Sequence, residues 1–178
     1  LILSALGVII TVLGYVIAIA VARYSPGAFL RAMAGPSAVA LSTRSSLASL
    51  PAMLTAAAEL GIEQRKADVV LPLAVALFRA TGPAMNIGVA LYVAHWIGVE
   101  ISWTGYAAGI AVAAMASIGA VSLPGQISFV TSIAPISLAL GVPIEPLALL
   151  IAVETIPDTF RTLGNVTLDV AVTGAVSR

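Results

Sequence analysis

The chain has 178 residues, of which 60% are hydrophobic and 9% charged, and its formal net charge is zero. An ordinary soluble domain carries about a quarter charged residues, so this composition excludes a water-soluble domain and favours a chain surrounded by membrane lipid. The absence of cysteine excludes disulfides and thiolate metal sites. A neutral chain without a Gly-rich phosphate loop gives no sign of nucleic-acid binding or of a resident cofactor.

The first uncharged run covers residues 1–22, which is long enough for one transmembrane helix at about 20 residues. The chain starts inside this run, with neither an initiator Met nor a basic region before it. We therefore expect part of a longer protein rather than a secretory signal peptide.

Basic residues set the expected orientation, because cytoplasmic loops of membrane proteins carry an excess of Lys and Arg. This rule places Glu100 and Glu145 outside, and it places on the cytoplasmic side Arg23, Arg31, Arg65, Lys66 and Arg178. Residues 23–64 then leave the cytoplasmic side and return to it. We interpret them as a linker and a first re-entrant hairpin, broken at Ser45-Ser46 and at Pro51.

Residues 65–99 are predicted to form a broken transmembrane helix. Thr81-Gly82-Pro83 should interrupt it, because proline removes a backbone donor and disfavours helical geometry in the residue before it.

A second hairpin is expected over residues 100–144, where no charge occurs from 101 to 144 and Gly119 and Pro124-Gly125 break the run. Each arm has roughly 16 residues, which is short for a membrane crossing. Two complete crossings are the alternative. The tips of the two hairpins share a pattern, since Ser49-Leu50-Pro51 recurs as Ser122-Leu123-Pro124, and this favours an inverted repeat with a binding site at the membrane midplane.

Residues 145–178 are predicted to form a last transmembrane helix with a polar face. Its 3.6-residue period aligns Glu154, Asp158, Arg161, Thr162, Asn165 and Asp169. Charges at this depth are costly and are kept facing the protein interior. Arg161 suits a carboxylate and Asp158 an ammonium group, so the face matches a zwitterion with an additional acid. The alternative is that Asp158 and Arg161 only neutralise each other.

Several hydroxyl groups occur in the first hairpin. Arg44, Ser45 and Ser46 there are candidates for binding an anion beside a helix N-terminus. Ordinary turn chemistry is the alternative for these serines. An intramembrane enzyme would need a nucleophile beside His95, which we place at the outer interface, so no enzymatic activity is expected.

The sequence resembles the dicarboxylate/amino acid:cation symporter family over nearly its whole length. The resemblance is carried by Thr43-Arg44-Ser45-Ser46, Leu50-Pro51, Leu71-Pro72-Leu73, Ala116-Ser117-Ile118-Gly119, Leu123-Pro124-Gly125 and, above all, Asp158-x-x-Arg161-Thr162-x-x-Asn165-x-x-x-Asp169.

The resemblance implies an all-α membrane protein in which three spanning helices and two re-entrant hairpins form an inverted repeat. It also implies an elevator-type transport domain, whose scaffold and homotrimer contacts would lie in a missing N-terminal part. In this family Arg161 would bind the substrate side-chain carboxylate and Asp158 its amino group. Thr162 and Asn165 would assist, and Ser46 and the backbone near Leu123 would close the site.

One segment departs from the family pattern. Where the family carries an Asn-Met-Asp-Gly-Thr motif, this chain has Phe78-Arg79-Ala80-Thr81-Gly82. Sodium sites are still implied at Asp169, Asn165, Ser117, Ile118 and Ala120, but the lost side chains argue against full sodium coupling and leave Na⁺ or H⁺ as the coupling ion. We hypothesise that Arg79 acts as a tethered cation. The alternative is that it pairs with Asp169, or reaches the interface, in a divergent homologue.

These patterns together predict a secondary active transporter (a symporter) of acidic amino acids or dicarboxylates such as aspartate or glutamate, working by alternating access. We expect a multi-pass protein of a cell membrane, in bacteria the inner membrane, with lipid and a small anionic solute as partners. An anion channel, or a substrate-sensing or inactive homologue on the same scaffold, is the alternative.

Overall fold

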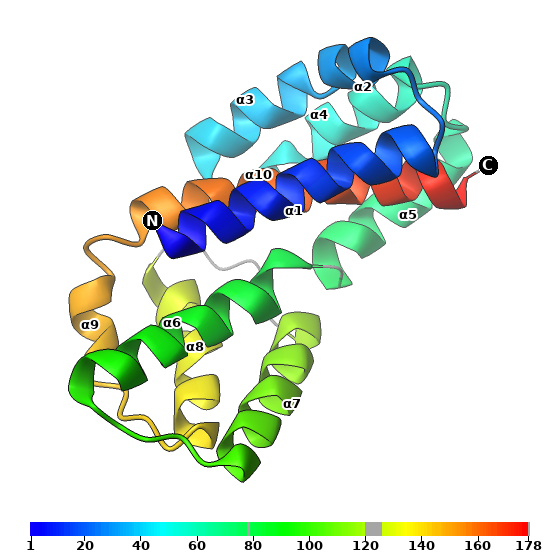
Figure 1. The fold of residues 1–178 in the computed structure, drawn as a ribbon. Helices are drawn as coiled ribbons and strands as arrows, with labels where there is room; N and C mark the ends of the chain where they lie inside the picture. Colours follow the sequence, from blue (N-terminus) through cyan, green and yellow to red (C-terminus); the bar gives the residue numbers. More distant parts are fainter. Residues whose placement is uncertain (78, 120–125, 178) are drawn as a thin grey trace.

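A computed structural model describes residues 1–77, 79–119 and 126–177, and these ranges are mostly helical, without a strand (Figure 1). The all-α class is therefore confirmed. The described helices are α1 (Ile2–Ala20), α2 (Pro26–Ala32), α3 (Ala34–Thr43), α4 (Ser46–Glu59), α5 (Gln64–Leu77), α6 (Thr81–Ile97), α7 (Trp103–Gly119), α8 (Gln126–Ala139), α9 (Leu147–Leu150) and α10 (Thr155–Val176).

Helix α10 is the central element, and it packs against α1, α3, α4, α5 and α6. Its most extensive partner is α1, and the two helices lie side by side over most of their length (Figure 1). The buried residues of α1 are Gly7, Gly14 and Ala18, which share one helix face. Because lipid tails are as apolar as Leu, membrane helices associate through close van der Waals packing, and small residues allow that approach.

Two hydrophobic cores flank α10. The first joins α1–α5 to the C-terminal half of α10 through residues such as Phe29, Met53 and Val166. The second joins α6–α9 through residues such as Val93 and Ile133. In Figure 1 the first group lies above the second, and the N-terminal half of α10 lies where they meet. Polar side chains of α10 can therefore be enclosed there without entering either apolar core.

The first hairpin consists of α3 and α4, which pack together across the turn Arg44–Ser45. Arg44 takes the left-handed conformation at φ 53°, and the Ser45 hydroxyl caps α4 by accepting a hydrogen bond from the Ala48 N–H at 3.2 Å. The break predicted at Pro51 is wrong, because Pro51 lies inside α4. The turn is set by Arg44 and Ser45, six to seven residues before Pro51, and it coincides with the break predicted at Ser45-Ser46.

The helix predicted over residues 65–99 is divided into α5 and α6. Thr81, Gly82 and Pro83 lie inside the first turn of α6 rather than in the break, which precedes them. A helix leaves its first N–H groups without internal partners, so a proline in the first turn loses no helical hydrogen bond. The second hairpin consists of α7 and α8, which pack together, and its predicted tip at Ser122-Leu123-Pro124 lies outside the described residues.

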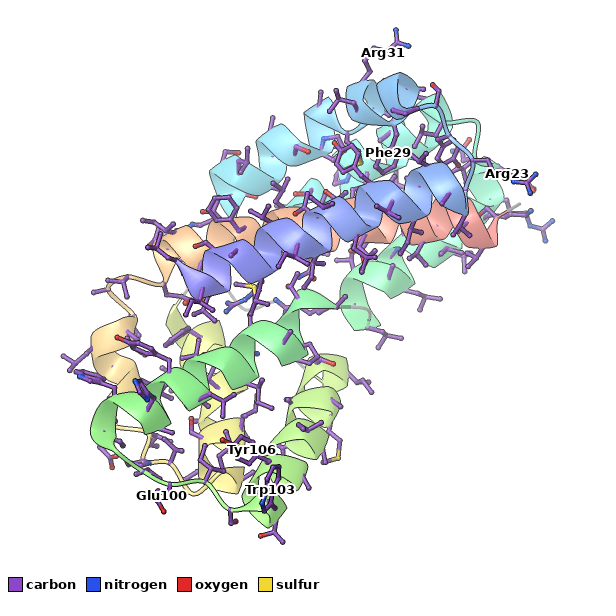
Figure 2. All side chains as sticks on the ribbon, in the orientation of Figure 1. Arg23, Phe29, Arg31, Glu100, Trp103 and Tyr106 are labelled. Carbon is purple, nitrogen blue, oxygen red and sulfur yellow. The ribbon has the colours of Figure 1, made fainter. Side chains whose placement is uncertain are left out.

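The two ends of the molecule carry different charges. Figure 2 shows Arg23 and Arg31 at one end, and Glu100 with Trp103 at the other. Lys66 donates a hydrogen bond from Nζ to the Ser177 carbonyl at 2.8 Å, where a cation also meets the negative end of α10. Among the described residues, two stretches are long and apolar enough to cross a membrane: Ile2–Ala20, and Gln64–Ile97, which holds α5 and α6.

The contact between α1 and α10 predicts a specific effect of adding one methyl group. A Cβ at Gly7 would lie 2.7 Å from the Phe160 Cβ and 2.8 Å from the Phe160 carbonyl oxygen. Gly→Ala in a helix ordinarily stabilises by about 0.5–1 kcal/mol, whereas overpacking costs about 1–3 kcal/mol. We therefore expect Gly7→Ala to lower the unfolding midpoint of the complete protein in detergent, measured by circular dichroism.

The matched control is Gly35→Ala in α3, where an added Cβ meets nothing within 4 Å. This change should leave the midpoint unchanged or raise it. Equal midpoints for the two variants would show that the close contact between α1 and α10 does not limit stability.

Candidate functional site

The polar face predicted on the last helix is enclosed by protein. Arg161 is 9% exposed and Asp169 is 1% exposed, and Thr162 and Asn165 are buried as well. Asp158 is partly buried at the N-terminal end of α10. Helices on several sides of α10 cover this face, so its charges avoid the cost of contact with lipid.

Arg161 is held by two carboxylates from its own end of α10. Its Nη1 lies 2.6 Å from the Glu154 Oε1, and it donates a longer hydrogen bond of 3.4 Å to the Asp158 Oδ1. The Glu154 contact is the shorter of the two and is an ion pair. Two negative charges therefore accompany the single positive charge of Arg161. Glu154 lies closer to the guanidinium than Asp158 does.

The other edge of the Arg161 guanidinium makes no hydrogen bond with either carboxylate. Its Nε and Nη2 are buried and have no hydrogen-bond partner among the described residues. A buried donor without a partner is costly, and a charged one more so. These two atoms form the planar fork that a carboxylate binds with two parallel hydrogen bonds.

Asn165 connects α10 to the start of α6. Its Oδ1 accepts hydrogen bonds from the Thr81 N–H at 3.1 Å and from the Thr81 hydroxyl at 2.9 Å. The Thr81 hydroxyl also lies 3.3 Å from the Arg161 carbonyl oxygen. The side chain of one helix thus satisfies an N-terminal donor of another, which fixes where α6 begins.

A small pocket opens beside this connection. It is bounded by Arg161 and Asn165 of α10, by residues of α6, α7 and α8, and by Arg79 in the break before α6; its described lining is Arg79, Gly82, Asn86, Ala116, Ser117, Ser132, Arg161 and Asn165. This lining includes two arginines and several neutral polar residues but, among the described residues, no carboxylate. Glu154, Asp158 and Asp169 lie close to the two arginines without lining the pocket.

Arg79 is partly buried and lies among charged groups. Its charge is opposed by that of Arg161 and is attracted by those of Asp158 and Asp169. Asp169 in turn has a buried Oδ1 without a hydrogen-bond partner among the described residues, and the charge of Arg79 acts on it. The structure thus brings Arg79 to the same region as Asp158, Arg161 and Asp169.

The predicted residues of the first hairpin are not among the described residues that line this pocket. Arg44 is exposed, Ser45 serves as the cap of α4, and Ser46 is buried in the first turn of α4, and none of them lines the pocket in the described part of the chain. In the second hairpin, Ser117 lines the pocket and the Ile118 side chain is exposed. Leu123 and Ala120 lie outside the described residues.

Several residues of the site were not among those predicted. Glu154 was recognised only as an extension of the polar face, yet it makes the shortest contact of Arg161. Thr81, Asn86 and Ser132 were not singled out as site residues, although each bounds the pocket or its connection to α10. The available signal was that Asn86 and Ser132 are polar residues within mostly apolar helices, which is costly unless the group has a role.

Comparison with known proteins identifies relatives over the whole chain. Residues 1–178 match the sodium:dicarboxylate symporter family. The chain is 36% identical over 161 residues to excitatory amino acid transporter 3 of Mus musculus, and the aligned residues cover 89% of this chain and 30% of the relative. It is 28% identical over 170 residues to the C4-dicarboxylate transport protein of Rhizobium johnstonii, covering 89% of this chain and 36% of the relative.

A third relative has a different kind of substrate in its name. Neutral amino acid transporter A of Homo sapiens is 30% identical over 145 residues, covering 81% of this chain and 27% of the relative. This chain thus spans about a third of the length of the proteins it resembles. The names of these relatives do not agree on the charge of the substrate, so the substrate must be argued from the site.

The connection between Thr81 and Asn165 predicts an energetic coupling. We expect a double-mutant cycle of Thr81→Val and Asn165→Ala to give an interaction energy of about 0.5–2 kcal/mol, because the two residues share buried hydrogen bonds. The measurement is unfolding of the complete protein in detergent. A control cycle of Asn165→Ala with Thr55→Val, whose hydroxyl bonds within its own helix at 3.2 Å, should be additive. Additivity in both cycles would contradict the connection.

Proposed function

The chain belongs to the sodium:dicarboxylate symporter family, and we propose that it forms the substrate-carrying part of a secondary active transporter for acidic amino acids or dicarboxylates. The observation that carries the proposal is the buried, unpartnered edge of Arg161. A carboxylate of the substrate would provide hydrogen-bond acceptors for that edge and so remove an energetic cost. The adjoining pocket adds neutral donors and the positive end of α6.

Asp158 decides between the two substrate types. Its carboxylate is partly buried and makes only a long hydrogen bond of 3.4 Å to Arg161, because Glu154 makes the closer contact. Asp158 is therefore available for an ammonium group. An acidic amino acid would use both Asp158 and Arg161, whereas a dicarboxylate would use the guanidinium alone. We propose the acidic amino acid as the preferred substrate.

The described helices support re-entrant hairpins in this proposal. The arms of the first hairpin, α3 and α4, have 10 and 14 residues, and each is shorter than the roughly 20 residues of a spanning helix. We propose that the two hairpins enter the membrane from opposite sides, and that each returns to the side from which it came.

By the same proposal the chain moves by an elevator mechanism against a scaffold formed by other parts of the protein. The protein would be a homotrimer in a cell membrane, which in bacteria is the inner membrane.

Arg79 bears on the coupling ion. Both lone pairs of the Asn165 Oδ1 accept hydrogen bonds from Thr81, which leaves this oxygen no capacity for sodium in the described arrangement. Asp169 is attracted by the fixed charge of Arg79. We propose that Arg79 compensates Asp169 electrostatically in place of a sodium ion, and that the coupling ion is H⁺ or a cation held elsewhere.

Substitutions of Arg161 and Asp158 test the proposed substrate. Arg161→Ala should abolish binding of labelled aspartate and succinate, and Arg161→Lys should weaken both by about 10–100-fold, since the charge remains but the fork is lost. Asp158→Asn should weaken aspartate by about tenfold or more and succinate much less, because only aspartate has an ammonium group. The measurement is equilibrium binding to the complete protein in liposomes.

The control is Arg31→Ala, which removes an arginine whose Nε donates only to the carbonyl of Gly27 in α2. This variant should bind both substrates like the wild type. Equal losses of aspartate and succinate in Asp158→Asn would exclude an ammonium contact. Accelerated exchange of labelled aspartate by unlabelled substrate inside the liposomes would support a carrier, whereas its absence during net flux would indicate a channel.

The role of Arg79 in coupling predicts how binding responds to sodium. Replacing Na⁺ by choline should change aspartate affinity of the wild type by less than about threefold, because a fixed charge needs no mobile cation at Asp169. Arg79→Met should make the affinity depend on sodium. A wild-type affinity that falls steeply when sodium is removed would contradict this role.

A further inference from the structure

Glu154 is a largely buried carboxylate that the proposed substrate contacts do not use. It directly precedes α10, and its side chain is 12% exposed. Its Oε1 lies 2.6 Å from the Nη1 of Arg161, which is the shortest ion pair among the described residues. An unpaired charge in the protein interior is costly, so each partner of this pair stabilises the other.

Helical spacing places Glu154, Asp158 and Arg161 in one row. Positions i, i+4 and i+7 share a helix face, and the side chains of a helix point back toward its N-terminus. The Arg161 side chain therefore runs back past Asp158, and its Nη1 meets Glu154, which lies about 10 Å of helix rise before Arg161. Glu154 thus holds the tip of the arginine from one turn beyond Asp158.

The two carboxylates compete for the same nitrogen of Arg161. Glu154 lies 2.6 Å from Nη1 and Asp158 lies 3.4 Å from it. Coulomb attraction rises as the separation falls, and 3.4 Å is long for a charge-assisted hydrogen bond, which typically measures about 2.7–2.9 Å. Within the described ranges, this long bond is the one side-chain hydrogen bond of the Asp158 carboxylate. Glu154 therefore holds the guanidinium more closely, and Asp158 stays weakly engaged.

Removal of the Glu154 charge would change the partner of Arg161. Asp158 would then be the nearest described carboxylate, and residues three apart on a helix are neighbours that form ion pairs. The guanidinium would move toward Asp158, because a buried charge without a close partner is strongly destabilising. A carboxylate in a close pair with arginine has fewer acceptor positions left for an ammonium group. The availability of Asp158 therefore depends on Glu154.

We propose that Glu154 is a positioning residue that sets the preference for a substrate with an ammonium group, because it binds Arg161 and so keeps the Asp158 carboxylate available. This role rests on the proposed function, in which Asp158 binds the ammonium group of an acidic amino acid. Glu154 acts through Arg161 and Asp158, and it is not among the described residues that line the pocket. Its contact with Nη1 also leaves the edge formed by Nε and Nη2 for the substrate carboxylate.

The experiment compares a substrate that has an ammonium group with one that lacks it. Equilibrium binding of labelled aspartate and of labelled succinate to the complete protein in liposomes is measured for wild type, Glu154→Gln, Asp158→Asn and the double variant. Glu154→Gln should narrow the preference for aspartate over succinate by about tenfold, because Asp158 then pairs closely with Arg161. The double variant should show the same preference as Asp158→Asn, because Glu154 then has no Asp158 carboxylate to keep available.

Two further variants sharpen the comparison. Glu154→Asp keeps the charge on a side chain that is one methylene shorter, so it should retain part of the preference for aspartate. Glu145→Gln is the matched control, because it removes an exposed carboxylate from the segment just before α9. This control should keep the wild-type preference.

The outcomes separate this role from the proposed function. A Glu154→Gln variant that keeps the wild-type preference, including one that loses both substrates equally, would overturn the role of Glu154 while binding by the wild type still supports the transporter. A further narrowing when Glu154→Gln is added to Asp158→Asn would overturn it as well, since the effect would not pass through Asp158. Failure of the wild type to bind aspartate and succinate would overturn the proposed function itself. If Glu154→Gln does not give a monodisperse protein, Glu154→Asp, alone and with Asp158→Asn, decides by the same two comparisons.

Discussion

The packing of helices around α10 is closely tied to how Arg161 is stabilised in the interior of a membrane protein. Arg161 lies on a helix that five other helices cover, and its guanidinium is anchored on one side by Glu154 and Asp158. An isolated charge at this depth would be prohibitively costly, so carboxylates of the same helix accompany it. They contact a single nitrogen, however, and the rest of the guanidinium faces the interior without a partner in the described chain. The protein therefore stabilises the arginine enough to bury it and leaves part of its hydrogen-bonding capacity unused within the described chain.

The enclosure of this arginine is shared between two groups of helices. The first core packs α1–α5 against α10, and Gly7 and Gly14 allow the backbones of α1 and α10 to approach closely. The second core, formed by α6–α9, meets α10 through the hydrogen bonds of Thr81 with Asn165. The pocket lies at this boundary. A change in the packing of either group would alter the separation of Arg79 and Arg161, so the shape of the pocket depends on the relative position of the two groups.

The amino-acid sequence predicted the parts of this site that follow from helical periodicity. Arg161, Thr162, Asn165 and Asp169 were expected on one protected face because a 3.6-residue period aligns them and lipid penalises their charges, and all of them are buried. It could not predict that Thr81, 84 residues before Asn165, starts α6 by donating to its side chain. Helix starts are set locally only when a capping residue is nearby, and here the acceptor comes from another helix. The sequence therefore predicts the break at Thr81-Gly82-Pro83, although it precedes Thr81. In the first hairpin the break predicted at Ser45-Ser46 agrees with the turn Arg44–Ser45, whereas the one predicted at Pro51 falls inside α4.

The balance of charge at the site bears on what must accompany the substrate. Two guanidinium groups, those of Arg79 and Arg161, face three carboxylates, those of Glu154, Asp158 and Asp169, so the ionised site has one negative charge in excess. Without Arg79 the excess would be two. An acidic amino acid adds a further negative charge, and a dicarboxylate adds two, while burial in a low-dielectric interior makes each uncompensated charge expensive. Arg79 thus lowers the number of mobile cations that the loaded site requires without lowering it to zero. For the transporter proposed above, this excess favours a proton or a cation that accompanies the substrate, and Arg79 changes how many such charges are needed.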